Sequence, residues 1–263
     1  MARAAAEVTV MGAGVFGLGI AFACARRGAR VVVVDPDGVA AGASGGLVGA
    51  LAPHVPEGWN PKKAFQFEAL AMAPAWWAGV EAISGRSSGY ARLGRLQPIA
   101  DLAALDLARA RSATARDLWQ GLGAWDVGPA HAWGDWVPAS PTGQVILDTL
   151  SARLNPRAGM RALAAAVTAL EGRIVRGSDR PGEAGGETVV WATGYRGLAT
   201  LGAAVGRDVG CGVKGQAALL AVDRRDAPQI YADGLHIVPH ADGTVAIGST
   251  SERVFDDPAA TDS

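Results

Sequence analysis

A short segment near the amino terminus strongly restricts what this chain can fold into. The β-branched run EVTVM at 7–11 leads into a G-x-G-x-x-G sequence at 12–17, and apolar residues then recur at helical spacing. The run ARVVVV at 29–34 follows and ends at Asp35. A strand, a glycine turn, a helix and a second strand within about 30 residues predict a βαβ unit with parallel strands.

Each part of this signature has a physical role in binding a dinucleotide. Gly12 permits a tight turn, Gly14 lets a pyrophosphate approach the backbone, and Gly17 allows the helix to pack closely on the strand. The first turn of the helix offers free N–H groups and a partial positive charge to phosphate. Asp35, at the end of the second strand, is placed to accept a hydrogen bond from a ribose hydroxyl. A carboxylate there disfavours a 2′-phosphate, so the pattern predicts FAD or NAD.

Composition indicates a folded chain that neither binds polyanions nor spans a bilayer. Of 263 residues, 49% are hydrophobic and 19% charged, which predicts a substantial core. The 24 Lys and Arg residues balance 25 Asp and Glu residues, so no nucleic-acid partner is expected. No run of residues approaches the roughly 20 apolar positions of a membrane span, and no signal-like segment precedes the first strand. We therefore expect a cytoplasmic protein.

The two cysteines, Cys24 and Cys211, are too few and too widely spaced for a disulfide framework or a zinc site. We expect both to be buried, reduced thiols, and we expect no metal site.

The remaining sequence predicts a second region interleaved with the first. The segment 40–53 is a loop of small residues, suited to close approach of the backbone to a flat partner. Seven of the eight tryptophans lie between residues 56 and 140, which marks a change in composition. The patterns predict helices at 61–84, 101–121 and 142–154, a polar loop at 176–187, and strands at 90–99, 160–169, 173–175, 188–192, 215–222, 229–231, 235–239 and 244–247.

These elements predict an α/β protein with two domains, each built from two stretches of chain. A doubly wound, Rossmann-like nucleotide-binding domain should comprise 1–55 and 141–210. An α+β substrate domain should comprise 56–140 and 211–263 and be built on a mainly antiparallel sheet. The Asp242-Gly243 pair is typical of a hairpin turn between its last two strands.

Several separated motifs resemble the glycine oxidase/D-amino-acid oxidase-like family of FAD-dependent oxidoreductases. The sequence GAGVFGLGIAFACARRGARVVVVD resembles the opening of the family, and GASGGLVGALAPH at 42–54 resembles its second flavin-binding loop. Further matches are AAVTAL at 165–170, VVWATG at 189–194, GVKGQAALL at 212–220 and HIVPHADGTVAIGST at 236–250.

The resemblance implies noncovalently bound FAD and hydride transfer from the C–N bond of a small amino acid, such as glycine, sarcosine or a D-amino acid. In it, Ser44 and the segment 49–51 would face the flavin, and Val167 would contact the adenine side through the backbone of a strand. Cys211 lacks the sequence context of a covalent flavin attachment. The implied cofactor-binding residues are Gly12, Ala13, Gly14, Val15, Phe16, Asp35, Pro36, Ser44, Gly49, Ala50, Leu51, Val167, Ala192, Thr193 and Gly194.

His236 is the candidate catalytic residue, because related sequences carry a polar aromatic residue beside the substrate at this position. It alternates with Val238, so both should face the same side of a strand. A histidine that only packs on a half-buried strand is the alternative. His54 is expected to pack within its loop, His240 to be exposed before the hairpin turn, and His131 to have no catalytic partner.

Two other functions stay open beside oxidation of an amine or amino-acid substrate. The flavin-binding loop also resembles the FAD domain that trims a modified uridine in tRNA, although the neutral net charge disfavours that partner. Members of the oxidase family normally continue into a G-x-R-P segment and a closing glycine-rich strand and helix, which these 263 residues do not include. A truncated flavin-binding remnant without turnover is therefore the third possibility.

Overall fold

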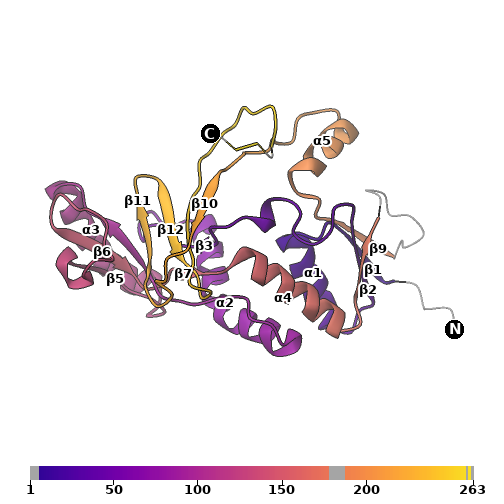
Figure 1. Cartoon of the computed structure of the whole chain (residues 1–263), viewed down its shortest axis with the longest axis horizontal. Coiled ribbons are helices and arrows are strands. Elements are labelled where there is room, and N and C mark those ends of the chain that lie inside the picture. Colours follow the sequence, from indigo (N-terminus) through magenta and orange to yellow (C-terminus); the bar gives the residue numbers. More distant parts are fainter. Residues whose placement is uncertain (1–5, 178–186, 259, 262–263) are drawn as a thin grey trace.

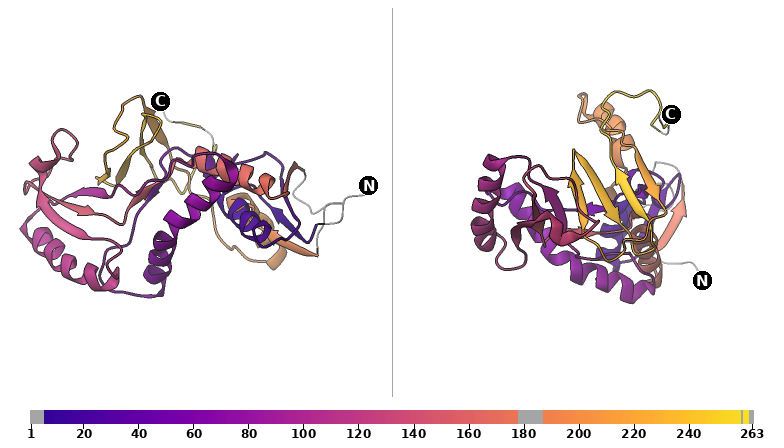
Figure 2. Two further views of the ribbon diagram at one scale, coloured as in Figure 1. Left: turned by 90° about the horizontal axis from the view of Figure 1, so that it is seen from below. Right: turned by 60° about the vertical axis from the view of Figure 1, so that its left-hand side comes forward.

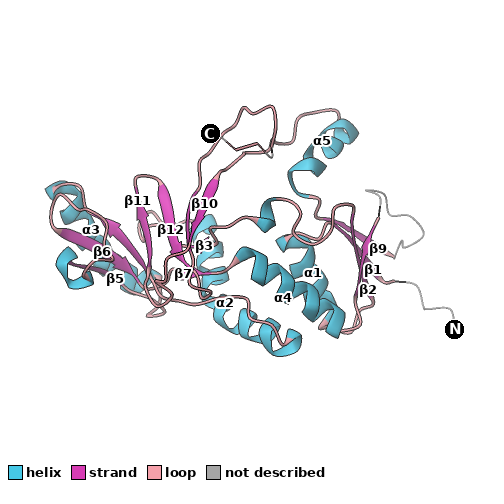
Figure 3. Cartoon of the chain, viewed as in Figure 1, coloured by secondary structure: helices cyan, strands magenta, loops and turns pink. Residues whose placement is uncertain are grey.

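The computed structural model describes residues 6–177, 187–258 and 260–261. Within these residues the strands form a four-stranded sheet, a seven-stranded sheet and a small pair, β3 (Ala50–Leu51) with β7 (Ala152–Arg153). Figure 1 shows the four-stranded sheet near the amino terminus, the seven-stranded sheet toward the opposite end, and β3 and β7 between them. Figure 3 shows the same division by secondary structure, with helices beside both large sheets.

The four-stranded sheet is parallel and has the strand order β8-β2-β1-β9. Met11 pairs with both Val34 and Trp191, so the carboxyl ends of β1, β2 and β9 lie side by side. The expected parallel pairing of the 188–192 strand with the first strand is confirmed. The strands are β1 (Val8–Met11), β2 (Val31–Asp35), β8 (Arg173–Arg176) and β9 (Thr188–Trp191). The predicted 176–187 loop lies largely outside the described residues.

Two helices, α1 (Val15–Ala25) and α4 (Pro156–Ala169), pack on one face of this sheet. Val10 and Val33 point into that core against Leu18 and Phe22, all of them fully buried. Side chains of opposite parity, Met11, Val32 and Val34, form a smaller cluster on the other face. Successive valines of β2 point to opposite faces of the sheet, so this continuous apolar run makes both faces of the strand apolar.

The stretch 160–169 is helical, and its prediction as a strand is wrong. Asn155 caps α4 by accepting a hydrogen bond from the Ala158 N–H at 3.0 Å, and Pro156 occupies the first turn. Buried Met160, Leu163 and Val167 recur at helical spacing, which the continuous alanine-rich run concealed.

The predicted contact of Val167 with adenine depended on that strand and is corrected with it. Val167 is fully buried in the core, and its carbonyl accepts a hydrogen bond from the Gly172 N–H. The strand beside β2 is instead β8, where Val175 pairs with Val34.

The seven-stranded sheet has the order β10-β13-β12-β11-β4-β6-β5, and its pairs are antiparallel except for β4 with β11. The mainly antiparallel sheet predicted for the second region is thus confirmed. Its strands are β4 (Arg95–Pro98), β5 (Trp125–Pro129), β6 (Gln144–Asp148), β10 (Ala217–Leu220), β11 (Gln229–Ala232), β12 (Leu235–Pro239) and β13 (Val245–Gly248). The predicted hairpin turn joins β12 to β13, with the His240 N–H donating to the Thr244 carbonyl.

The helix predicted at 142–154 does not form. This stretch contributes β6, which lies between β4 and β5, and β7, which pairs with β3. Backbone pairing on both sides of β6 outweighs its helical spacing. Consequently the boundary drawn at 141 is misplaced, because β6 belongs to the mixed sheet.

Helix α2 (Pro61–Ser84) connects the two hydrophobic cores. Its Phe67 and Leu70 pack beneath the mixed sheet together with helix α3 (Leu102–Leu118), whereas Trp77 and Val80 pack against α1 and α4. Figure 2 shows α2 extending from the mixed-sheet end toward α4. One rigid helix therefore contributes to the packing of both sheets.

The environment of the cysteines differs from the expectation. Cys24 is half-buried in α1, and Cys211 is exposed in the segment before β10, so only the first has a packing role. No helix among the described residues has the length and apolarity required to cross a membrane.

Replacing Leu163 in α4 with Ala should lower the free energy of unfolding by about 2–5 kcal/mol, because its side chain is 1% exposed within the core. Arg161→Ala, at an exposed position of the same helix, is the matched control and should change it by less than about 0.5 kcal/mol. Urea unfolding measures both. Equal effects of the two substitutions would contradict the helical placement.

Candidate functional site

The loops after β1 and β9 meet in a close backbone contact. A Cβ atom on Gly12 would lie 2.3 Å from the Ala192 carbonyl oxygen, and one on Gly17 would lie 1.9 Å from the Gly12 carbonyl oxygen. Gly12 also has φ of 110°, a region that favours glycine. Gly12 and Ala192, both predicted to bind the cofactor, therefore lie in contact in the structure. Thr193 and Gly194 follow directly at the start of helix α5 (Gly194–Val205).

Asp35 organises the turn that follows β2. One carboxylate oxygen accepts from the Ala13 N–H at 2.8 Å, and the other accepts from the N–H groups of Asp37 and Gly38 at 2.9 and 2.8 Å. A carboxylate has about four acceptor positions, so these three bonds leave capacity for one further donor. Pro36 is exposed beside it. Asp35 thus joins the glycine loop to the end of β2.

Ser44 lies at the amino terminus of α1. Its Oγ accepts a hydrogen bond from the Val15 N–H at 2.9 Å, and a Cβ atom on Gly14 would lie 3.0 Å from the same oxygen. Val15 and Phe16 are 41% and 78% exposed, so the first turn of α1 is open to solvent. The N-terminus of the helix therefore faces the loop that carries Ser44, which takes up the first of its N–H donors.

The loop at residues 42–51, here called the flavin loop, is held by side chains from distant parts of the chain. His240 Nε2 lies 2.8 Å from the Leu47 carbonyl oxygen, and Arg157 Nε donates to the Gly45 carbonyl at 2.8 Å. Because a carbonyl can only accept, the Leu47 contact makes Nε2 the protonated nitrogen of His240.

The second half of the flavin loop is held by backbone pairing and by one buried amide. The Gly49 carbonyl accepts from the Leu154 N–H at 2.9 Å, and a Cβ atom on Gly49 would lie 1.8 Å from the Leu154 carbonyl oxygen. Ala50 and Leu51 form β3 against β7. Gln229, 2% exposed, donates through Nε2 to the carbonyls of Ala152 and Leu51 at 3.0 and 3.4 Å.

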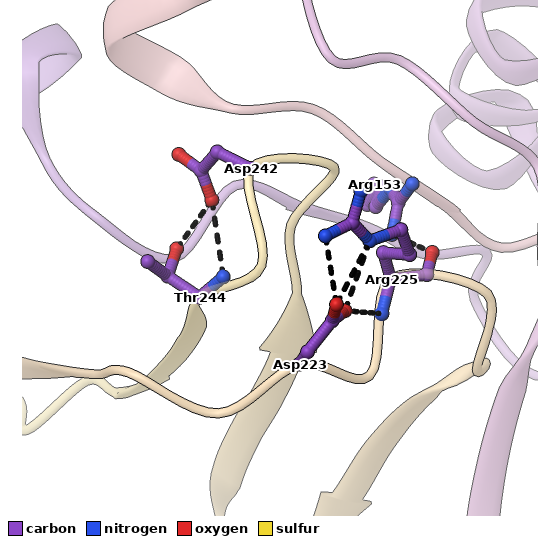
Figure 4. Close-up of polar contacts among 5 residues, drawn as sticks. All are labelled: Arg153, Asp223, Arg225, Asp242 and Thr244. Carbon is purple, nitrogen blue, oxygen red and sulfur yellow. Dashed lines mark hydrogen bonds and ion pairs between the residues drawn. The ribbon is translucent and has the colours of Figure 1, made fainter.

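His240 is 1% exposed, so its expected exposure is wrong. It packs where the β12–β13 turn meets the flavin loop, and burial holds its pKa below the ordinary value despite the opposing effects of the Leu47 carbonyl and Asp242. Nearby, Arg153 donates to the carbonyls of Pro239 and Arg225, the first at 2.9 Å. Figure 4 shows this junction, with Arg225 paired to Asp223 and Asp242 accepting from Thr244.

A cavity of about 620 Å³ lies alongside the flavin loop. Its walls also come from the start of α5, where Arg196 forms an ion pair with Asp37, and from the edge of the mixed sheet. The lining residues are Ala41–Ala43, Gly45–Gly49, Pro156, Tyr195, Arg196, Gly212, Val213, Gly215, Ala217, Ser249, Phe255 and Pro258.

His236 shares a face of the mixed sheet with a residue of that cavity. Ala217, Gly248, His236 and Tyr231 are paired in register on four adjacent strands, so their side chains project to the same side. The rings of Tyr231 and His236 are in contact, with centroids 4.7 Å apart. Burial lowers the pKa of His236, and the positive charge of Arg95 lowers it further. A neutral imidazole on the sheet face that carries Ala217 is a suitable partner for a polar ligand.

The structure brings most of the predicted residues into one region, and it adds three that the sequence patterns did not indicate. Arg157, Gln229 and His240 hold carbonyls of the flavin loop from positions 112 to 193 residues away along the chain. A local motif could not reveal such partners. Among the described residues, no His, Cys, Asp and Glu side chains gather as they would around a metal ion.

Comparison with protein families agrees with this arrangement. Residues 7–263 match the family model described as DAO, FAD dependent oxidoreductase. The chain belongs to this family. The match includes the glycine loop, the flavin loop and the strands of the mixed sheet.

Solved structures share the fold. Glycine oxidase from Geobacillus kaustophilus has 21% identity and a TM-score of 0.75, covering 97% of this chain and 74% of that protein. Iminodiacetate oxidase from Chelativorans sp. BNC1 has 21% identity and a TM-score of 0.77, covering 93% and 72%. L-proline dehydrogenase from P. horikoshii has 15% identity and a TM-score of 0.72, covering 96% and 72%.

Curated relatives match over shorter segments. The tRNA 5-methylaminomethyl-2-thiouridine biosynthesis bifunctional protein of Polaromonas sp. is 54% identical over 54 residues, which are 20% of this chain and 8% of that protein. Its counterpart in Chromohalobacter salexigens is 36% identical over 80 residues, which are 30% of this chain and 11% of that protein. The matched part therefore spans about a tenth of these relatives.

Burial of His240 should make stability depend on pH. Because its folded-state pKa is lowered, the unfolded chain binds more protons below about pH 6.5, and the free energy of unfolding should fall there. His240→Gln retains a donor for the Leu47 carbonyl but does not titrate, so it should reduce this fall. His236, whose pKa is also lowered, accounts for part of the remainder.

Urea unfolding between pH 5 and 8 measures this dependence, with His131→Gln at an exposed position as the control. A pH dependence that is the same in wild type and His240→Gln would contradict the assigned role.

Proposed function

We propose that this FAD-dependent oxidoreductase oxidises the C–N bond of a small amino acid, using FAD held noncovalently along the glycine loop and the flavin loop. The observation that carries the proposal is the meeting of three elements at one place. The flavin loop lines the 620 Å³ cavity, its Ser44 accepts from the start of α1, and Ala217 in the cavity wall belongs to the mixed sheet.

The residues present fit a dinucleotide. Gly12 lets the loop after β1 approach Ala192, Gly14 brings the start of α1 close to Ser44, and the first turn of α1 offers a positive helix end to a diphosphate. In this proposal Ala13, Val15 and Phe16 line the diphosphate path with their backbone, and the Ala13 and Val15 N–H groups, which donate to Asp35 and Ser44, fix the course of the turn. Asp35 accepts from the ribose through its remaining acceptor position.

Ser44 and Gly49–Leu51 adjoin the flavin in this proposal, and Pro36 and Ala192–Gly194 border the nucleotide. When bound, FAD supplies the acceptor for a hydride from the α-carbon. The chain orients that carbon and excludes water from the reacting atoms. His236 holds the substrate carboxylate or a water beside the amine, because it shares its face of the sheet with Ala217 in the cavity wall.

The substrate class is supported by the structural neighbours. Their names describe oxidases of glycine and iminodiacetate and a dehydrogenase of L-proline, all of them amino or imino acids of small size. A small substrate also suits a site whose cofactor would take up most of a 620 Å³ cavity.

Oxidation of an amine side chain on a tRNA uridine is the second candidate. It is favoured by the 54% identity over 54 residues with a tRNA-modifying protein. Against it stands a formal net charge of -1, since tRNA binding depends on clustered Lys and Arg residues.

Anaerobic reduction of the bound flavin distinguishes these functions. Glycine, sarcosine, proline or a D-amino acid should bleach the flavin absorbance of the FAD-loaded protein, whereas undermodified tRNA should not. Bleaching by tRNA alone would favour the second candidate. Flavin that binds but is reduced by none of these compounds would support a flavin-binding protein without turnover and contradict the proposal.

Gly14→Ala should weaken FAD binding by at least about tenfold, or about 1.4 kcal/mol, because the added Cβ enters the space between the helix N-terminus and Ser44. Gly19→Ala is the matched control in the same helix, where a Cβ atom meets nothing within 4 Å. It should leave FAD affinity unchanged and stabilise the fold by up to about 1 kcal/mol. Flavin fluorescence titration measures the affinities; equal affinities of the two variants would exclude Gly14 from the cofactor site.

A further inference from the structure

The face of the mixed sheet that carries His236 also carries a row of polar side chains. Asp148, Arg95 and Gln229 are paired in register on β6, β4 and β11, and Tyr231 follows Gln229 two residues along the same strand. All four therefore share one face, and Tyr231 pairs with His236 on the next strand. Gln229 itself contacts the flavin loop, so this polar row begins beside the proposed cofactor site.

A buried ion pair fixes one end of the row. Arg95 Nε donates to Asp148 at 2.8 Å, and the two side chains are 8% and 0% exposed. The second oxygen of Asp148 accepts from the Ser151 N–H at 2.8 Å. Removing either charge alone from such a pair leaves the other buried without compensation, which is why both are retained together.

From this pair the row continues through the aromatic rings to His236. The guanidinium carbon of Arg95 lies 5.7 Å from the centre of the Tyr231 ring, which contacts the His236 ring on its other side along the sheet. Tyr231 is thus a spacer between a cation and an imidazole. Its ring is held in place by both neighbours.

The ion pair lies with its positive member, Arg95, nearer to His236 than its negative member, Asp148. In the strand order β12-β11-β4-β6, Arg95 is two strands from His236 and Asp148 is three strands away. The charge that acts on His236 is accordingly that of Arg95, whose positive sign lowers the pKa of the imidazole. The neighbour of His236 on the other side, Gly248, carries no charge to oppose it.

His236 also has an unused hydrogen-bonding atom. Its Nδ1 is buried and has no hydrogen-bond partner among the described residues. Buried polar atoms are normally paired, so this unpaired nitrogen indicates a polar ligand. A positive field and an available imidazole together favour an anion.

We propose that Arg95, oriented by Asp148 and acting through the Tyr231–His236 stack, supplies the positive potential that draws the substrate carboxylate to His236. Arg95 is a positioning residue in this scheme, since His236 is the group that contacts the carboxylate. Arg95 lies in β4 of the mixed sheet and is therefore a different residue from the arginine of the family's G-x-R-P segment. The inference rests on the proposed function in assuming that the substrate carries a carboxylate.

Two variants give opposite expectations. Asp148→Asn keeps one acceptor oxygen, for either Arg95 or Ser151, and removes the negative charge, so the potential at His236 becomes more positive. The double variant Arg95→Gln/Asp148→Asn replaces the ion pair by a neutral amide pair and removes the positive potential. A purely structural role of the pair would make both variants less stable and weaken ligand binding in both.

The test uses the full 263-residue chain with saturating FAD, and acetate as a carboxylate probe that cannot be oxidised at a C–N bond. Histidine ring resonances are followed by NMR, with the His236 signal assigned from its loss in His236→Gln. Acetamide, which is neutral and of similar size, is the matched control ligand. Urea unfolding of each variant checks that the fold is retained.

Acetate should shift the His236 resonance and acetamide should not. Asp148→Asn should tighten acetate binding by about threefold or more and lower the pKa of His236, whereas the double variant should weaken binding by about threefold or more and raise that pKa. Asp148→Asn leaves Arg95 buried without its counter-charge, so should that variant fail to fold, the weaker acetate binding and raised His236 pKa expected of the double variant decide the matter, and unchanged or tighter binding there overturns the proposal.

Weaker or unchanged acetate binding in Asp148→Asn would overturn the proposal, as would an equal response to acetamide. The acetate-binding test and the flavin-reduction experiment can fail independently. If amino acids do not reduce the flavin but acetate binds as described, the oxidase function fails and the carboxylate site stands.

Discussion

The backbone of the flavin loop is the element on which the rest of the site depends. Its carbonyl groups would be costly to bury without partners, and four of them are bonded from three other parts of the chain. Arg157 and Leu154 come from the segment around the start of α4, His240 from the end of β12, and Gln229 from β11. The loop therefore takes a single course between the parallel and mixed sheets. Because Ser44 lies within it, the same contacts also place the hydroxyl group at the start of α1.

The two sheets contribute different chemistry to this junction. The parallel sheet aligns the carboxyl ends of three strands, where backbone N–H groups and a helix N-terminus favour phosphate. Close contact of Gly12 with Ala192 allows these strand ends to approach. The mixed sheet offers a face that is apolar under α2 and α3 and polar from Arg95 to His236. In the proposed function, the parallel sheet holds the cofactor and the mixed sheet orients the substrate, with one loop joining the two.

Helix α2 joins the two sheets, since its side chains pack into both cores on either side of Pro74. A change in the angle between the sheets would forfeit close packing around these buried side chains. Charges near the site are likewise constrained. Arg95 is held in place by its ion pair with Asp148, and burial lowers the pKa values of His236 and His240.

The sequence by itself determined the features that depend on neighbouring residues. The glycine turn with its flanking strands, Asp35 at the end of β2, and the Asp242-Gly243 hairpin all follow from local backbone preferences, and the structure contains each of them. The motifs also identified the FAD-dependent oxidoreductase family. Local patterns failed where an apolar run suits either a helix or a strand. The 160–169 segment became a helix because it packs as one stripe on the parallel sheet, and the 142–154 segment became strands because β4 and β5 pair with it. Tertiary structure alone decided the burial of His240 and the alignment of Arg95 with Tyr231 and His236. These contacts join residues far apart in the chain. They form only where the fold brings the segments together, so the neighbouring residues in the sequence do not reveal them.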